Sequence, residues 1–255
     1  MIRIGTSGFS YKDWIWPVYP ADLPARDHLS FYAREFSTVE LNVTYYRIPE
    51  PHVVAGWIRK TPPDFLFTVK AFGGLTHERE QPDFAAFVQA VKPLDEAGKF
   101  GCVLAQFPNS FHPTPENRDY LGRLREGLGE LHTVVEFRDA ALVKPATFDL
   151  LAGLGLGFCC VDEPRIQGLM PPVAAATGPL AYVRFHGRNA AKWYNHKEAW
   201  ERYDYTYSDE ELREWAPRVR ELDAAAGLTL VYFNNHYVGQ AVKGARDLGQ
   251  LLLLS

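Results

Sequence analysis

Eight short runs of apolar and β-branched residues recur along the 255-residue chain, and stretches with helical periodicity separate most of them. Val, Ile, Phe and Leu dominate these runs, and such residues favour strands. The runs cover residues 2–7, 38–43, 65–70, 102–107, 133–138, 158–162, 180–186 and 229–234. Strands that alternate with helices in this way predict a parallel sheet.

The intervening stretches repeat apolar residues at helical spacing. They cover residues 28–36, 53–59, 84–97, 116–128, 145–154, 209–226 and 239–254. Eight strands, each followed by a helical stretch or a long connection, make eight repeating units in a chain close to the usual length of about 250 residues. They predict an α/β protein with one (β/α)8 TIM-barrel domain over residues 1–255. An open, doubly wound sheet is the alternative.

Two connections depart from the regular pattern. Residues 163–179, after the sixth strand, are rich in Pro and Gly, and residues 187–207, after the seventh, are long and aromatic. We expect an irregular connection at the first and a long aromatic loop at the second.

The composition argues against some classes of protein. A net charge of −4 disfavours a protein that coats duplex DNA or an anionic membrane through a global positive field. Cys102, Cys159 and Cys160 have no CxxC spacing and are expected to be buried thiols. The chain shows neither an export leader nor an apolar run of about 18 residues, so we expect a cytoplasmic protein without a membrane span.

Polar side chains mark the C-terminal strand ends, where barrels of this kind place their active sites. In chain order they are Glu40, Asn42, Lys70, Gln106, Glu136, Arg138, Asp162, Arg184, His186, Asn234 and His236. Residues two apart in a strand share a face, and neighbouring strands lie about 4.8 Å apart. Strands five to seven are therefore predicted to form one wall that carries Glu136, Arg138, Asp162, Arg184 and His186.

Charges in apolar strands cost desolvation, which indicates a chemical role, although mutual pairing at a hydrated barrel mouth is the simpler alternative. The preferred hypothesis is an enzyme that acts on a small anionic substrate, phosphorylated or nucleotide-like. Glu136 or Asp162 would be the general acid or base, and His186 would shuttle protons. The stabilisers of negative charge would be Lys70, Arg138 and Arg184.

Lys70 ends an apolar run, so partial burial could lower its pKa and make it a base or an imine-forming amine. Anion binding and a structural ion pair are the other two roles open to it. Arg188, in the sequence HGR, adds a cation where barrels often bind phosphate.

Aromatic residues crowd the loops after the first and seventh strands. They could form a stacking wall for a base or a sugar, or could pin the two loops together, and the residues are Trp14, Trp16, Trp193, Tyr194 and Tyr203. The first possibility supports a second hypothesis, in which the chain is a binding module for a nucleotide or single-stranded nucleic acid without chemistry.

A third hypothesis is a metal-dependent hydrolase or isomerase. Suitable oxygen and nitrogen ligands are Glu40, His77, Glu136, Asp162, His186 and His236. Cations lie among them, however, and no HExxH or paired-cysteine spacing occurs. We therefore predict no cofactor. A glycosidase built on Glu136 and Asp162 is weaker still, because residues on adjacent strands need not straddle a sugar bond.

Several longer motifs run along nearly the entire chain: IGTSGFSYKDW, FSTVELNVTYYRIP, FLFTVKAF, GCVLAQFPNSF, VVEFRDA, VDEPR, YVRFHGR and VYFNNHYVGQAV. With them the chain resembles the YecE-like family, the domain of unknown function 72. The resemblance implies a TIM barrel and no established activity, and the likeness of such barrels to endonuclease IV and sugar isomerases is one of fold alone. The chain departs from the family pattern at Phe9, where Trp is usual, and at Glu163, where Ser is common.

The resemblance implies a set of site positions, most of which are the strand-end residues already named. They are Glu40, Asn42, Tyr46, Lys70, Gln106, Glu136, Arg138, Asp162, Arg184, His186 and Asn234.

Overall fold

Eight parallel strands form the centre of the molecule in a computed structural model that describes residues 1–253. The strands are β1 Ile2–Thr6, β2 Thr38–Leu41, β3 Leu66–Lys70, β4 Phe100–Gln106, β5 Thr133–Glu136, β6 Gly157–Asp162, β7 Ala181–Phe185 and β8 Thr229–Phe233. Each strand from β2 to β7 pairs with the next, and β8 also pairs with β1. The predicted (β/α)8 barrel is thus confirmed.

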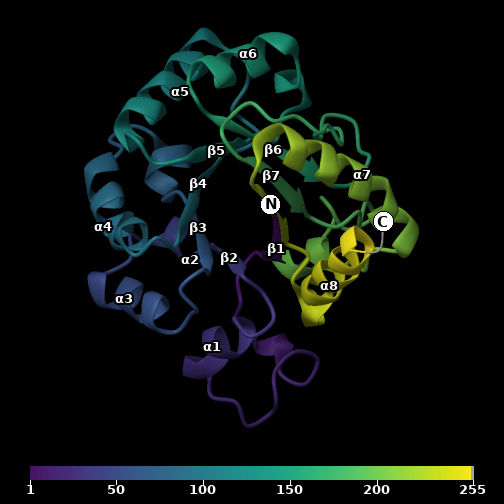
Figure 1. Cartoon of the computed structure of the whole chain (residues 1–255). Coiled ribbons are helices and arrows are strands. Elements are labelled where there is room, and N and C mark those ends of the chain that lie inside the picture. The colour runs from purple at the N-terminus through teal and green to yellow at the C-terminus, as the bar shows by residue number, and fades with distance from the viewer. Residues whose placement is uncertain (254–255) are drawn as a thin grey trace.

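Helices surround this barrel (Figure 1). They are α1 His28–Tyr32, α2 Val43–Tyr46, α3 Pro51–Arg59, α4 Phe84–Glu96, α5 Pro115–Leu128, α6 Pro145–Gly153, α7 Asp209–Ala226 and α8 Gln240–Leu253. Their ends follow local chemistry: Ser208 and Glu211 form a reciprocal capping box on α7, and Pro115 and Pro145 each begin a helix. The last predicted helix extended to Leu254, which lies outside the described residues.

The seam between β1 and β2 closes the barrel by close approach. Gly5 is required there, because a Cβ at this position would lie 2.3 Å from the carbonyl oxygen of Thr38. The Tyr32 hydroxyl accepts from the Thr6 amide (2.9 Å) and donates to the Thr38 carbonyl (3.1 Å). A single bridge, Ser7 to Glu40, continues the seam toward the mouth. The close approach at Gly5 and the hydrogen bonds of Tyr32 therefore hold this seam in place of a continuous ladder of backbone hydrogen bonds.

The two long connections differ from the rest of the barrel. No helix separates β6 from β7 in the part of the chain that the structure describes. The connection from β7 to α7 contains one 3-10 turn, Ala199–Tyr203. The segment between β1 and β2, which holds α1, projects at the bottom of the view in Figure 1.

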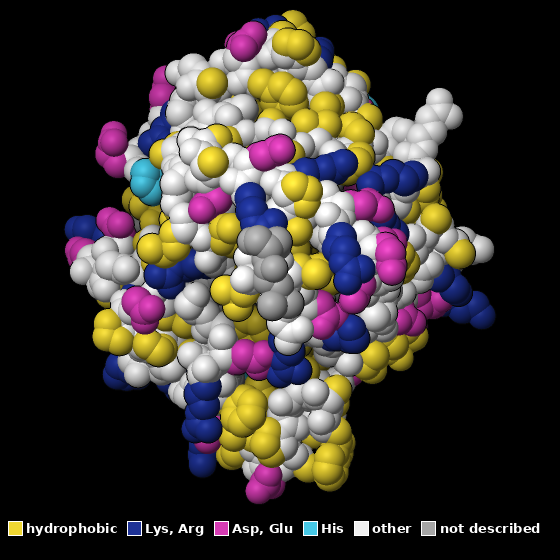
Figure 2. All heavy atoms as spheres, turned by 45° about the vertical axis from the view of Figure 1, so that its right-hand side comes forward, with side chains coloured by type: hydrophobic (Ala, Val, Ile, Leu, Met, Phe, Trp, Pro, Cys, Tyr) yellow, Lys and Arg dark blue, Asp and Glu magenta, His cyan; other side chains and the backbone are white. Residues whose placement is uncertain are grey.

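The surface carries both signs of charge. On the face shown in Figure 2, Lys and Arg side chains are interspersed with Asp and Glu. Within residues 1–253, no helix combines the length and apolarity needed to cross a lipid bilayer. The three cysteines are buried and free.

Candidate active site

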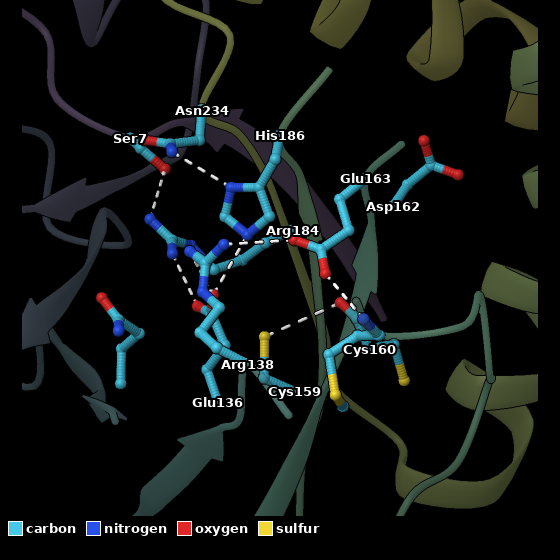
Figure 3. Close-up of polar contacts among 12 residues, drawn as sticks. Ser7, Glu136, Arg138, Cys159, Cys160, Asp162, Glu163, Arg184, His186 and Asn234 are labelled. Carbon is cyan, nitrogen blue, oxygen red and sulfur yellow. Dashed lines mark hydrogen bonds and ion pairs between the residues drawn. The ribbon is translucent and has the colours of Figure 1, made fainter. Parts of the chain in front are cut away.

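Arg184 joins four strands at the mouth of the barrel (Figure 3). This β7 side chain is 2% exposed, and it donates from Nη1 to Glu136 Oε2 (2.6 Å) and from Nη2 to Glu40 Oε1 (2.7 Å). Nη2 also lies 3.4 Å from Ser7 Oγ, and the Tyr182 hydroxyl donates to the other oxygen of Glu40 (2.7 Å). The guanidinium is therefore held in one orientation by fully buried carboxylates.

Glu136 is the anionic centre of the cluster. Besides Arg184, it accepts from Arg138 Nη2 (2.7 Å) and His186 Nε2 (3.1 Å). Burial acts to raise the pKa of this carboxyl, but the charges of Arg138 and Arg184 outweigh burial and hold the pKa well below its ordinary value. Glu136 is thus a permanent carboxylate that positions two arginines.

His186 takes one defined tautomer in this cluster. Its Nε2 faces a carboxylate and must donate, while its Nδ1 accepts from Asn234 Nδ2 (3.1 Å). Burial, reinforced by the charge of Arg138, lowers the pKa of His186 to about 3. The ring is a neutral bridge between β8 and Glu136.

A cavity of about 590 Å3 opens above this cluster. Its charged lining consists of Lys70, Arg138 and Arg184, whereas Glu40, Glu136 and His186 lie behind the lining. Tyr11, Tyr45, Tyr46, Trp57 and Tyr203 contribute aromatic side chains. The cavity therefore presents cations next to an aromatic wall.

Lys70 differs from the two arginines in its partners. Arg138 contacts Glu136 and Glu163, and Arg184 contacts Glu40 and Glu136. Lys70 Nζ donates instead to the neutral Gln106 Oε1 (3.0 Å) and lies 4.7 Å from the centre of the Tyr45 ring. Burial, and then the charge of Arg184, lower the pKa of Lys70 to about 8.

Three polar atoms of residues that line the cavity are buried without a hydrogen-bond partner among the described residues. They are Arg184 Nε, a donor, Asn42 Oδ1, an acceptor, and His236 Nδ1. Buried polar atoms normally have partners, since an unpaired one costs about 1–3 kcal/mol. All three atoms have almost no accessible surface, so they are unsatisfied polar atoms around the cavity and are not themselves open to it.

A family model described as "Protein of unknown function DUF72" matches residues 3–255. The chain belongs to this family. The protein YunF of Bacillus subtilis is 32% identical to it over 99% of this chain and 95% of YunF. YecE of Escherichia coli is 32% identical over 44% of this chain and 40% of YecE. A DUF72 protein of Thermotoga maritima has the same fold, with a TM-score of 0.92, 41% identity and 99% of each chain covered.

The structure separates the predicted DUF72 motif positions into three groups. Those that line the cavity are Asn42, Tyr46, Lys70, Gln106, Arg138, Arg184 and Asn234. Glu40, Glu136 and His186 support them from behind through the contacts given above. Asp162 is apart from both groups and points away from the Glu136 cluster (Figure 3).

Asp162 organises contacts on the outer side of the barrel. It accepts from Arg188 Nε and Nη2 (both 2.8 Å), from the Trp215 indole (2.7 Å) and from the Tyr207 hydroxyl (2.8 Å). Arg188 also contacts Glu211 and Glu214 of α7. The predicted wall from strand five to strand seven therefore lacks Asp162. Both Asp162 and Arg188 fix the connection between β7 and α7.

We expect Asp162→Ala to lower the free energy of unfolding by about 1–3 kcal/mol, because it leaves the buried donors of Trp215 and Tyr207 unpaired. The loss is limited because Arg188 keeps two other carboxylates. Urea denaturation followed by circular dichroism measures this, with the exposed Asp119→Ala as the matched control. Equal stabilities of the two variants would contradict the structural role.

The aromatic wall of the cavity contains neither Trp14 nor Trp193. Trp14 is 0% exposed and donates to the His236 carbonyl (2.7 Å), and Trp193 is 3% exposed and packs against Arg202. Both pin loops in place, which is the alternative that the sequence left open. Of the predicted aromatic residues, Tyr203 lines the cavity. Sequence reasoning missed Tyr11 and Tyr45, which also line it. Tyr11 follows β1 and Tyr45 lies in α2 directly after β2, and this position after a strand is the one signal that could have found them.

Glu163, where the chain departs from the family pattern, is a buried partner of the cavity. Its Oε2 accepts from Arg138 Nη1 (3.2 Å) and its Oε1 from the Met170 amide (2.8 Å). It thereby ties the connection after β6 to a cavity arginine.

Within residues 1–253, no group of three or more His, Cys, Asp or Glu side chains is arranged to hold a metal ion.

Proposed function

We propose that the cavity binds a small organic anion and that the protein acts on it by acid–base and electrostatic catalysis. The observation that carries this proposal is Lys70, a partly buried cavity cation with no acidic partner among the described residues. A desolvated charge without a counter-ion is costly, and a bound anion offsets that cost. Arg138 and Arg184, which line the same cavity, add positive charge near that anion.

Proton transfer is the chemistry that suits Lys70 best. Because its pKa is about 8, the ammonium and the free amine of Lys70 interconvert readily near neutral pH. Glu136, predicted from the sequence as a general acid or base, and His186, predicted as a proton shuttle, are fully buried behind the lining. In this proposal they position Arg138 and Arg184, whose charges stabilise negative charge on the substrate.

The aromatic wall suits a ligand that has a planar or apolar part. Tyr45 and Tyr46 pack edge to face with ring centres 5.1 Å apart, and Trp57 lines the same side of the cavity. Such rings bury apolar surface while the cations hold the acidic group. The candidate ligands are therefore carboxylates and phosphate monoesters of modest size.

Calorimetric titration with inorganic phosphate, nucleoside monophosphates, sugar phosphates and oxo acids tests the proposal. We expect at least one of these anions to bind, and Lys70→Met to weaken that binding at least about tenfold, as the loss of a charged hydrogen bond predicts. Lys243→Met is the matched control, since Lys243 is exposed and pairs with Asp247 on α8. Failure of every anion to bind would overturn the proposal.

Lys70→Met should make the protein more stable at neutral pH. Folding buries the ammonium and lowers its pKa, so the charged form costs stability below pH 8. Removing it should raise the free energy of unfolding by an amount on the order of 1–3 kcal/mol. Urea denaturation at pH 7 measures this, and a variant less stable than the wild type would show that Lys70 is a structural cation.

A further inference from the structure

We propose that Lys70 forms an imine with the carbonyl carbon of a 2-oxo acid. The inference rests on the proposed function, because it names the substrate class and the reaction of the same site. It assigns Lys70 a covalent role beyond the anion binding and proton transfer of the proposed function.

The surroundings of Lys70 leave its nitrogen free to react. A carboxylate partner would hold the side chain as an ammonium ion, whereas the neutral Gln106 Oε1 can accept a hydrogen bond from either an ammonium or an amine. Nζ also lies 4.7 Å from the centre of the Tyr45 ring. Burial and neighbouring cations are the two conditions that favour an amine nucleophile, and both occur here.

The other cations of the cavity explain why the carbonyl compound should be an acid. Arg138 and Arg184 line the same space as Lys70. In a 2-oxo acid the carboxylate is bonded directly to the carbonyl carbon. One small molecule therefore offers an acceptor to a guanidinium and an electrophile to the amine.

The reaction balances without a further reactant. One proton leaves the Lys70 ammonium. The amine lone pair then forms the C–N bond while the carbonyl π pair moves to oxygen, and this oxygen takes up a second proton from the same nitrogen. The resulting carbinolamine loses its hydroxyl group as water, using the proton released at the start, and the nitrogen lone pair forms the C=N bond. The sum is ammonium plus ketone giving iminium plus water.

Reductive trapping tests this step. The full-length protein is incubated with glyoxylate, pyruvate or 2-oxoglutarate and cyanoborohydride, and peptide mass spectrometry then locates the adducts. We expect at least one oxo acid to modify Lys70, adding its own mass less one oxygen atom, at least tenfold more than Lys92 or Lys243. Lys70→Arg keeps the charge and should lose the adduct while it still binds the same oxo acid in calorimetry.

The outcomes separate the two proposals. Oxo-acid binding without an adduct at Lys70, or with equal labelling of the exposed lysines, overturns the imine and leaves the anion site standing. Absence of both binding and trapping overturns the imine and, if phosphate and the nucleotides also fail to bind, the proposed function too. Circular dichroism of Lys70→Arg confirms that the loss of the adduct is not a loss of fold.

Discussion

Glu136→Ala is expected to lower the free energy of unfolding by about 3–5 kcal/mol, the usual cost of removing one partner from a buried ion pair. The substitution leaves Arg184, which is 2% exposed, with Glu40 as its remaining counter-ion, and it takes one of the two carboxylates from Arg138. The neutral His186 also loses its acceptor. Urea denaturation followed by circular dichroism measures the effect.

Two further variants make this result specific. Glu96→Ala removes an exposed carboxylate whose partner Lys92 is four residues away on α4, and it should change the stability by less than about 0.5 kcal/mol. Glu136→Gln keeps the shape of the side chain and should fall between the wild type and Glu136→Ala. An Ala variant as stable as the Glu96 control would show that the cluster does not hold the strands together.

Anion affinity is expected to fall about tenfold between pH 7 and pH 9.5. Lys70 is charged below its pKa of about 8 and neutral above it, so the charged hydrogen bond to the anion is lost as the pH rises. Sulfate is a suitable probe because its own charge does not change in this range. Calorimetric titration at several pH values gives the affinities.

The same titration of Lys70→Met isolates the titrating group. The variant should bind sulfate weakly and with little change over the whole range, since Arg138 and Arg184 keep their charges there. A parallel fall in affinity in both proteins would assign the pH dependence to another group. Constant affinity in the wild type would contradict the position of Lys70 in the binding site.

The barrel could be predicted because its strands must be apolar to be covered by helices. Each predicted strand agrees with an observed strand to within a few residues, and residues 209–226 were predicted as the helix that the structure shows. The helix starts could be predicted from side chains that cap the first backbone N–H groups, as in the capping box at Ser208. Helix α1 ends at Tyr32, earlier than predicted, because the following residues turn to bring Phe36 into the core.

The site was predicted less fully because sequence does not give the register between strands. In β6 and β7, Val161 lies beside Arg184 and Asp162 lies beside Phe185. The Asp162 carboxylate therefore lies on the same outward face of the sheet as Phe185. In β4 and β5, Gln106 lies beside Glu136 on the inward face. A shift of one residue would exchange these faces. Strand ends could therefore be identified as polar, while their direction required the three-dimensional structure.

The pairing of β1 with β8 has a consequence for how the protein is made. Ile2 lies beside Thr229, so β1 is without this neighbour until β8 has been synthesised. Asn234 and His236, which line the cavity, follow β8 in the chain. Ser7, at the end of β1, contacts Arg184 across the barrel. The cavity lining is therefore completed only after β8 has been synthesised, and a nascent chain that ends at β7 lacks part of it.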